Sequence, residues 1–370
     1  AGIAPQHCLP VTIDVGTNNE SLLNDELYIG LEQRRVRGED YDSLIEEFIE
    51  AVQVQFPGVL TQLEDFGNCN AFRLLAQYRH RACLFDDDIQ GTGAVGLSGL
   101  LSALRITGEK LEDQRFLFCG AGQASIGIAS TVVAALVEQG IAAEQAQQCC
   151  WFFDTRGLLV GSRSDIPSQK APFAHDHAPV SSLEEAVEDL RPTALIGASG
   201  QGGMFTEPLL RRMAQYHERP IIFALSNPTA NAECSAEQAY QWTDGRAIFA
   251  SGSPFSPVDY GNQRFVPGQG NNAYIFPGVG LGVVASGSTR VSDQMFLAAS
   301  RCLAELVTEA DLEQGLLYPP LSKIREVSAI IAAEVARIAW DSGFTTVDRP
   351  DDILGFIKGS MYQPVYPHYA

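Results

Sequence analysis

The apolar and polar positions along the chain divide it into a mixed first part, a regular middle and a helical end. In the first part, the apolar run over residues 9–15 ends at Gly16 and predicts a buried strand. Apolar residues at helical spacing predict a helix over 41–56, which Pro57 and Gly58 end. A short apolar run predicts a further strand over 59–63.

In the middle of the chain, strand-like apolar runs alternate with stretches of helical spacing. The predicted strands are 115–119, 149–153, 193–196, 220–225 and 247–250. The predicted helices are 124–137, 182–190, 206–216 and 235–242, of which the last opens on a capping box of Ser235 and Gln238. Such alternation predicts an α/β fold with a parallel, doubly wound sheet of the Rossmann type. Helices are predicted again over 278–286, 291–307 and 322–340, before a polar tail.

Composition narrows the classes of partner. The 370 residues carry 25 basic and 45 acidic side chains, a net charge of -20, which argues against nucleic acid and anionic membranes as partners. The 8 cysteines form no C-x-x-C pair, so a thiolate zinc site is not expected. Their scattered positions predict reduced thiols in an intracellular protein. No uncharged apolar run is long enough to span a bilayer. The chain opens on Ala rather than Met, which suggests processing or a piece of a longer protein.

A glycine-rich turn follows the predicted strand 115–119. Its candidate dinucleotide ligands are Gly120, Gly122, Gln123, Ala124 and Ser125. The two glycines allow a tight turn and a close approach of a pyrophosphate to a helix N-terminus, although Ser125 stands where the third glycine is usual. The alternative is an ordinary strand-to-helix turn. A second glycine cluster, over 197–203, is interpreted as a wall of small residues beside the dinucleotide rather than as a second fingerprint.

The choice of nicotinamide cofactor depends on the end of the next strand. Asp154 ends the strand 149–153, where an acid reads the ribose 2′-hydroxyl of NAD. Arg156, Arg163 and Lys170 follow, and basic side chains there can neutralise the 2′-phosphate of NADP. The residues alone leave this choice open. They also leave open a helix-capping role for Asp154 and a solvated basic loop.

Two groups of acids lie about twenty residues apart. Glu64 and Asp65 follow one predicted strand, and Asp86, Asp87 and Asp88 form the second group. Hard oxygen ligands of this kind suit Mg²⁺ or Mn²⁺. The alternative is that Asp87 or Asp88 caps a helix that begins near residue 89.

Amide side chains mark two further loops. Asn227 follows the strand 220–225, at the edge where open α/β sheets bind ligands, and Asn271 and Asn272 open the helical part. Such amides can hold a carboxylate or a carboxamide. The alternatives are an Asx-turn before Pro228 and an N-cap at Asn272.

These residues and their order resemble the malic enzymes. Segments that match the family's signatures are 8–18, 64–68, 85–92, 120–122, 224–229, 250–255, 267–272 and 317–320. The resemblance implies oxidative decarboxylation of L-malate to pyruvate and CO₂, with reduction of a nicotinamide and a need for Mg²⁺ or Mn²⁺. It also implies a homo-oligomer, usually a tetramer. A cytoplasmic location is expected, with a mitochondrial or other organelle matrix as the alternative.

The resemblance also assigns roles to residues. Glu64, Asp65 and Asp88 correspond to the metal ligands, and Asp87 to a neighbour of metal and cofactor. Asn227 with Asn271 or Asn272 corresponds to contacts with malate and the nicotinamide, so these amides and Asp87 are the candidate catalytic group. Lys170, in a segment 168–175 typical of the NADP-using branch, and Arg156 favour NADP.

The family resemblance also implies the domain organisation. A dinucleotide domain over 87–271 is expected to be inserted into a catalytic domain made of 1–86 and 272–344, with a tail over 345–370.

The chain departs from the family in its acid–base residues. Malic enzymes use a lysine base, a tyrosine acid and an arginine clamp, all upstream of the segment that matches Ala1. Only four lysines are present, and none precedes Lys110. The expectation is therefore a C-terminal portion that turns over malate poorly alone. Rival hypotheses are a malolactic enzyme with bound NAD and a non-catalytic nucleotide-binding module.

Overall fold

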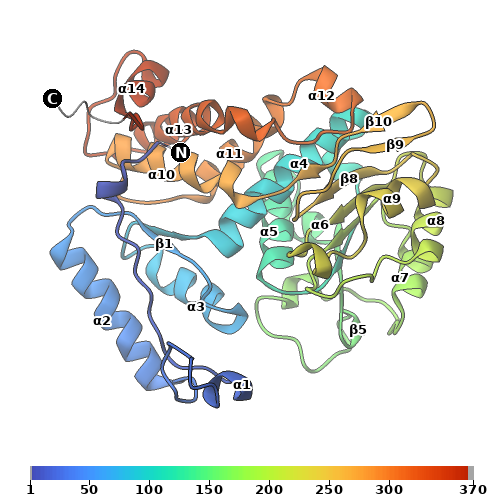
Figure 1. The fold of residues 1–370 in the computed structure, drawn as a ribbon, viewed down its shortest axis with the longest axis horizontal. Helices are drawn as coiled ribbons and strands as arrows, with labels where there is room; N and C mark the ends of the chain where they lie inside the picture. Colours follow the sequence, from blue (N-terminus) through green and yellow to red (C-terminus); the bar gives the residue numbers. More distant parts are fainter. Residues whose placement is uncertain (1, 366–370) are drawn as a thin grey trace.

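A seven-stranded sheet organises one side of the molecule, as the computed structural model shows for residues 2–365 (Figure 1). The strand order is β11-β8-β7-β6-β3-β4-β5, and all neighbours are parallel except β4 and β5. The strands are β3 (Phe116–Cys119), β4 (Cys150–Asp154), β5 (Gly157–Leu158), β6 (Ala194–Gly197), β7 (Ile221–Ala224), β8 (Ile248–Ser251) and β11 (Gly268–Gln269). The predicted parallel α/β sheet is confirmed.

Helices cover both faces of this sheet. Alternate residues of β3 enter different apolar clusters, with Phe116 and Phe118 in one and Leu117 and Cys119 in the other. The helices that connect the strands are α5 (Gln123–Glu138), α6 (Ala143–Gln147), α7 (Leu183–Leu190), α8 (Glu207–Tyr216) and α9 (Ala236–Trp242). The capping box of Ser235 and Gln238 forms as predicted at the start of α9. The sheet is thus doubly wound, because each face buries its own set of side chains.

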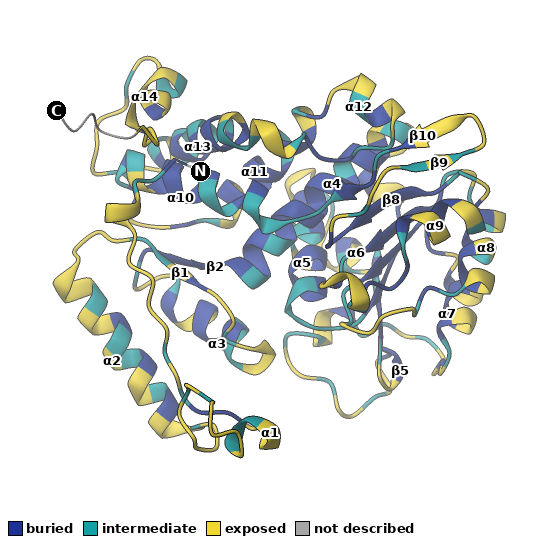
Figure 2. Ribbon diagram, in the orientation of Figure 1, coloured by how far each residue is buried: buried dark blue, intermediate teal, exposed yellow. Residues whose placement is uncertain are grey.

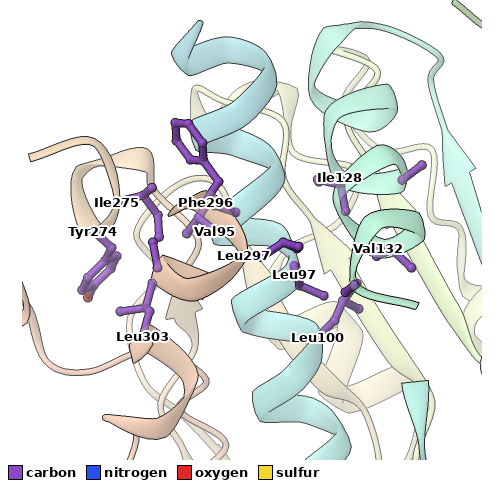
Figure 3. Packing of buried hydrophobic residues seen from close by; sticks show 14 of the residues in the cluster. Val95, Leu97, Leu100, Ile128, Val132, Tyr274, Ile275, Phe296, Leu297 and Leu303 are labelled. Carbon is purple, nitrogen blue, oxygen red and sulfur yellow. The ribbon is translucent and has the colours of Figure 1, made fainter. Parts of the chain in front are cut away.

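The helical end of the chain packs against the face of the sheet that α5 covers. Its helices are α10 (Phe276–Ser286), α11 (Asp293–Glu305), α12 (Glu309–Glu313), α13 (Ile324–Asp341) and α14 (Ile353–Ser360). Leu297 and Leu303 of α11, Leu100 of α4 (Thr92–Thr107) and Val132 of α5 belong to one apolar cluster, in which Leu297 lies beside Leu97 of α4 (Figure 3). The helix α14 lies in the stretch predicted to be a polar tail. Among residues 2–365, no helix is both long and apolar enough to cross a membrane.

The first eighty-six residues form a smaller layer beside these helices. It contains α1 (Glu20–Leu23), α2 (Glu39–Gln55), β1 (Thr61–Leu63), α3 (Asn68–Tyr78) and β2 (Leu84–Asp86). β1 and β2 pair in parallel, with Leu63 opposite Asp86. The predicted strand over 9–15 is wrong: this stretch is irregular, and it exposes 68% of Leu9 and 53% of Val11 (Figure 2). It pairs with no strand in the described part of the chain, so its apolar residues alone do not make it a strand.

A hairpin of β9 (Val258–Tyr260) and β10 (Gln263–Phe265) was not predicted. It turns at Gly261, whose φ of 60° suits glycine. Both strands are three residues long and lie beside the sheet without joining it. Runs so short carry little periodic signal, which explains why the pattern of the sequence did not reveal them.

Candidate functional site

The turn between β3 and α5 is built on close backbone packing. Gly120 has φ +102°, and a Cβ there would lie 2.7 Å from the carbonyl oxygen of Ala198. Only glycine meets both demands. The predicted cofactor loop therefore sits directly against the loop that follows β6, at the carboxyl edge of the sheet.

The N-terminus of α5 is met by a side chain from the other layer of the molecule. The backbone N–H of Gln123 donates a 2.7 Å hydrogen bond to Oδ1 of Asn68, the first residue of α3. The Ser125 hydroxyl is buried without a hydrogen-bond partner among the described residues. Free and side-chain-capped donors of this kind are what an anion can use at a helix N-terminus. Sequence reasoning placed Asn68 in a matching segment but gave it no role.

The end of β4 is an ion-paired pocket. The Arg163 guanidinium donates two hydrogen bonds to the Asp154 carboxylate, of 2.9 and 3.0 Å. The Arg163 and Asp154 side chains are only 13% and 16% exposed. Arg156 pairs with Asp165 at 3.0 Å. A cavity of about 220 Å³ is lined by these four residues and by Lys170, among others. Lys170 enters no ion pair within the described part of the chain, so its charge faces this cavity uncompensated.

The two acid groups come together because β1 and β2 run in parallel. Leu63 and Asp86 are register partners, so the residues that follow them emerge side by side. The backbone N–H of Asp65 donates a 2.8 Å hydrogen bond to Oδ2 of Asp88. Desolvation, with the charges of Asp88 and Asp65 nearby, raises the pKa of Glu64 although Gln62 donates a hydrogen bond to it. Burial, opposed by the bond from Asp65, also raises the pKa of Asp88.

The cap of the following helical turn is Asp86, which corrects the alternative that Asp87 or Asp88 plays this part. The Oδ1 of Asp86 accepts a 3.1 Å hydrogen bond from the N–H of Ile89. A π-helical turn, Asp87–Gly91, connects it to α4. Burial raises the pKa of Asp86 to about 7, and its Oδ2 has no hydrogen-bond partner among the described residues. Asp87 and Asp88 are thereby left available for other contacts.

Asp87 is buried and is held by Asn272 from the start of the helical end. The Asn272 amide donates to Oδ2 of Asp87 at 2.9 Å and to its carbonyl oxygen at 3.2 Å. Burial, opposed by this hydrogen bond, raises the pKa of Asp87 to about 7. A Cβ on Gly91 would lie 1.9 Å from Oδ1 of Asp87, so glycine makes room for the carboxylate. Oδ1 itself has no partner within residues 2–365.

The acids are close but do not form a finished metal site. Across residues 2–365, no three Asp, Glu, His or Cys side chains stand where they could hold one metal ion together. Glu64, Asp65 and Asp87 line a cavity of about 1800 Å³, which α2, α10 and the irregular stretch 2–17 also border. The assignment of Glu64, Asp65 and Asp88 as metal ligands therefore stays a prediction. Binding would require these side chains to move toward a common point.

The remaining amides flank the same edge of the sheet. Asn227 follows β7, is exposed, and makes no side-chain hydrogen bond within the described residues. Asn271 caps the short turn Asn272–Tyr274, because its Oδ1 accepts a 2.9 Å bond from the N–H of Ala273. The predicted cap at Asn272 is therefore wrong by one residue. Asn272 faces Asp87, and Asn271 and Asn227 lie at the ends of β11 and β7 in the same sheet.

A largely parallel sheet with a glycine turn after β3, its first strand in the chain, and a carboxylate at the end of the neighbouring β4 is typical of dinucleotide-binding α/β proteins. Comparison with known families is more specific. The model described as "Malic enzyme, NAD binding domain" matches residues 89–340, and "Malic enzyme, N-terminal domain" matches residues 1–79. The chain belongs to the malic enzyme family.

Individual relatives agree with this assignment. The NADP-dependent malic enzyme of Homo sapiens is 52% identical over 368 residues, which cover 99% of this chain and 64% of that protein. The chloroplastic NADP-dependent malic enzyme of Zea mays is 52% identical over 100% of this chain and 58% of its own length. The chain thus spans about three fifths of these relatives. The crystal structure of Entamoeba histolytica malic enzyme superposes with a TM-score of 0.73 at 25% identity, over 90% of this chain and 65% of that one.

Proposed function

We propose that this protein oxidises and decarboxylates L-malate to pyruvate and CO₂ with reduction of NADP⁺. The observation that carries the proposal is the joining of two sites. Asn68, which follows Asp65 by three residues, contacts the cofactor turn at Gln123. Asn272, which opens the helical end, contacts Asp87. A nucleotide on the cofactor turn and a substrate beside the acids would therefore be neighbours, as hydride transfer requires. The relatives named above are NADP-dependent malic enzymes, and they give no support to the malolactic alternative.

The preference for NADP over NAD is argued from charge. Arg163 neutralises Asp154, the acid that would otherwise repel a 2′-phosphate. Of the charged groups that line this cavity, Arg156, Arg163 and Lys170 outnumber Asp154 and Asp165. A phosphate dianion is accepted more readily there than by a lone aspartate.

The carboxylate groups beside β1 and β2 are hard oxygen ligands, the type that a divalent cation such as Mg²⁺ prefers. Glu64, Asp65 and Asp88 offer carboxylate oxygens, and the orphaned Oδ1 of Asp87 lies beside them. We assign the first three as ligands of Mg²⁺ or Mn²⁺. Such an ion supplies polarisation of the malate C2 oxygen when it is bound. Burial, with the charges of Asp88 and Asp65 adding to it, raises the pKa of Glu64, and the positive charge of a bound cation would oppose this shift.

The chain's own residues then have separate tasks. Asn272 holds Asp87 through a hydrogen bond to Oδ2, which leaves Oδ1 of this buried carboxylate free to face a bound cation or its ligands. Asn227 and Asn271, at the ends of β7 and β11, would bind the malate carboxylate and the nicotinamide carboxamide. Gly120, Gly122, Gln123, Ala124 and Ser125 would hold the pyrophosphate at the start of α5.

We also propose the predicted division of the chain, with 87–271 as the nucleotide domain between 1–86 and 272–344. All strands of the large sheet fall within 116–269, which supports these limits. One apolar cluster nevertheless joins α4 and α5 to α10, α11 and α13, so the two units share a core. The predicted tetramer and the predicted cytoplasmic location remain predictions.

The proposal is tested by ligand binding to the 370-residue chain. NADPH fluorescence is titrated with and without Mn²⁺ and oxalate, which is a planar analogue of the enolpyruvate formed in malate decarboxylation. We expect tighter NADPH binding when both are present, and loss of that gain in Glu64→Gln. Equal affinity for NADPH and NADH, with no effect of Mn²⁺ or of Glu64, would overturn the proposal in favour of a simple nucleotide-binding module.

A further inference from the structure

Glu233 is a fully buried acid that none of the roles above uses. It lies between β7 and α9 and is 0% exposed, with the buried residues Ala232 and Cys234 on either side. It enters no ion pair within the described residues. A buried carboxylate without a cation is costly unless hydrogen bonds satisfy it. The hydrogen-bond donors around Glu233 therefore indicate its role.

All of its donors come from two loops at the carboxyl edge of the sheet. From the loop after β6, Ser199 donates through its N–H at 3.1 Å and its hydroxyl at 3.2 Å. From the loop after β7, Ser226 donates through its hydroxyl at 2.5 Å and its N–H at 3.3 Å. The Ser226 hydroxyl also accepts from the N–H of Gly200 at 2.9 Å, which ties the two loops directly.

Glycine makes space for this carboxylate. A Cβ at Gly197, the last residue of β6, would lie 2.4 Å from the carboxyl carbon of Glu233. The cluster 197–203, interpreted from sequence as a wall against the dinucleotide, thus also provides the seat of a buried acid. On its other side the same loop presses on the cofactor turn, because a Cβ at Gly120 would lie 2.9 Å from the Cα of Ser199.

We propose that Glu233 is a positioning residue that sets the cofactor turn at Gly120 and the candidate ligand Asn227 at a fixed separation. It acts on the first through Ser199 and on the second through Ser226, which precedes Asn227 in the chain. The inference rests on the proposed function for the role of Asn227 as a ligand. The clamp, by which we mean the hydrogen bonds that join Glu233 to Ser199 and Ser226, does not depend on that function. Glu233 touches neither substrate nor reacting atoms in this role. Its influence would fall on the nicotinamide half of the nucleotide, since the adenosine half would occupy the cavity at the end of β4.

The test compares Glu233→Gln with Glu237→Gln, an exposed acid in the first turn of α9. Glutamine keeps one oxygen that can accept from both loops, as Oε1 does here, but it loses the negative charge and sets an N–H₂ group against the N–H of Ser226, so the loops should separate. We expect Kd for NADP⁺ to rise about tenfold in Glu233→Gln, as loss of a hydrogen bond to a charged group implies. Kd for 2′,5′-ADP, which lacks the nicotinamide half, should stay within about twofold. Glu237→Gln should leave both constants unchanged.

Two further measurements keep the inference falsifiable. If Glu233→Gln does not fold, Ser226→Ala removes the bridging hydroxyl alone and should shift the NADP⁺ constant in the same direction by a smaller factor. A ligand-free crystal structure of either variant should show residues 198–200 and 225–227 displaced relative to each other. Unmoved loops, or equal losses for NADP⁺ and 2′,5′-ADP, would overturn the positioning role. Failure of the proposed function is a different result: the unmodified chain would then show no preference for NADP⁺ while the clamp remains intact.

Discussion

The side-chain amide of Asn272 donates a 2.9 Å hydrogen bond to Oδ2 of Asp87, across 185 positions of sequence. This contact ties the start of the helical end to the acid group that follows β2. It is a contact of a buried carboxylate with a neutral donor, so removing the donor leaves a charge without compensation.

Removing this donor should destabilise the chain. We expect Asn272→Ala to lower the free energy of unfolding by about 1–3 kcal/mol, the cost of an unsatisfied buried group. Asn271→Ala, which removes a cap, should cost about 1 kcal/mol. Urea unfolding of Asn272→Ala, Asp87→Asn and the double variant measures the coupling between the two side chains. A coupling energy under about 0.3 kcal/mol would mean that they act independently.

The pocket at the end of β4 leads to a prediction about cofactor choice. Lys170→Gln should weaken NADP⁺ binding by roughly ten- to a hundredfold and leave NAD⁺ binding nearly unchanged, because only NADP⁺ brings a phosphate to this cation. Fluorescence titration with NADPH and NADH measures both constants. Lys323→Gln, an exposed lysine of the helical end, is the matched control. An equal loss for both nucleotides would show that Lys170 does not read the 2′-phosphate.

The acid group predicts stabilisation by a divalent cation. Mn²⁺ at a hundred times its Kd should raise the free energy of unfolding by about 2.7 kcal/mol, since it binds the folded chain only. Thermal unfolding with increasing Mn²⁺ should therefore show a rising midpoint. Glu64→Gln should abolish most of this rise, whereas Glu47→Gln, on the exposed face of α2, should keep it. An unchanged rise in Glu64→Gln would remove Glu64 from the ligand set.

His175 predicts a loss of stability in mild acid. Its Nε2 bonds the carbonyl oxygen of Cys150 at 2.8 Å and its ring packs on Trp151, and burial lowers its pKa below 6.5. The folded chain therefore favours the neutral ring. This stability is complete above the unfolded pKa of about 6.5 and is lost as pH falls through the lower folded value. Urea unfolding between pH 7.5 and 5 should show the loss.

The matched variants for this prediction are His175→Gln and His177→Gln. Glutamine can still donate to the carbonyl oxygen of Cys150 but does not titrate, so His175→Gln should flatten the pH profile. His177 is partly exposed, hydrogen-bonds the carbonyl oxygen of Ala178 and meets the Trp151 ring edge-on, so its replacement should leave the slope intact. The same slope in all three chains would assign the acid sensitivity to other groups.

Five strands of the central sheet, β3, β4, β6, β7 and β8, were predictable because each is a buried apolar run between helices of clear periodicity. β5 and β11 are only two residues long and were not predicted. β6 lies between β3 and β7, with Cys119, Gly197 and Ala224 in register, so the loops that carry Gly120 and Asn227 leave the same edge of the sheet two strands apart. The acids were predictable as a group, since β1 and β2 end beside each other. The role of each single residue was harder to predict. The two helical turns are capped by Asp86 and Asn271, each one residue before a position that the sequence offered as an alternative. Such choices depend on the direction of single side chains, which sequence periodicity does not encode.

The predictions failed where burial depends on distant partners. Residues 9–15 resemble a core strand in sequence, yet no strand within residues 2–365 pairs with them, and most stay exposed, with Ile13 and Val15 only partly buried. Conversely, α14 lies in the stretch 345–370 that was predicted to be a polar tail, although its own residues 353–357 are apolar apart from a glycine. Glu233 shows the same limit: an acid in sequence gives no sign that two serines from other loops will surround it.

The bond between Asn68 and Gln123 has a thermodynamic consequence. A pyrophosphate that takes the N–H of Gln123 must displace Oδ1 of Asn68, and Asn68 begins α3 just after Glu64 and Asp65. Filling one site therefore releases the segment that forms the other. By linkage, any change that the nucleotide makes in the affinity for the cation is matched by an equal change that the cation makes in the affinity for the nucleotide. The hydrogen bond between α3 and α5 would thus contribute to this coupling equally, whichever ligand binds first.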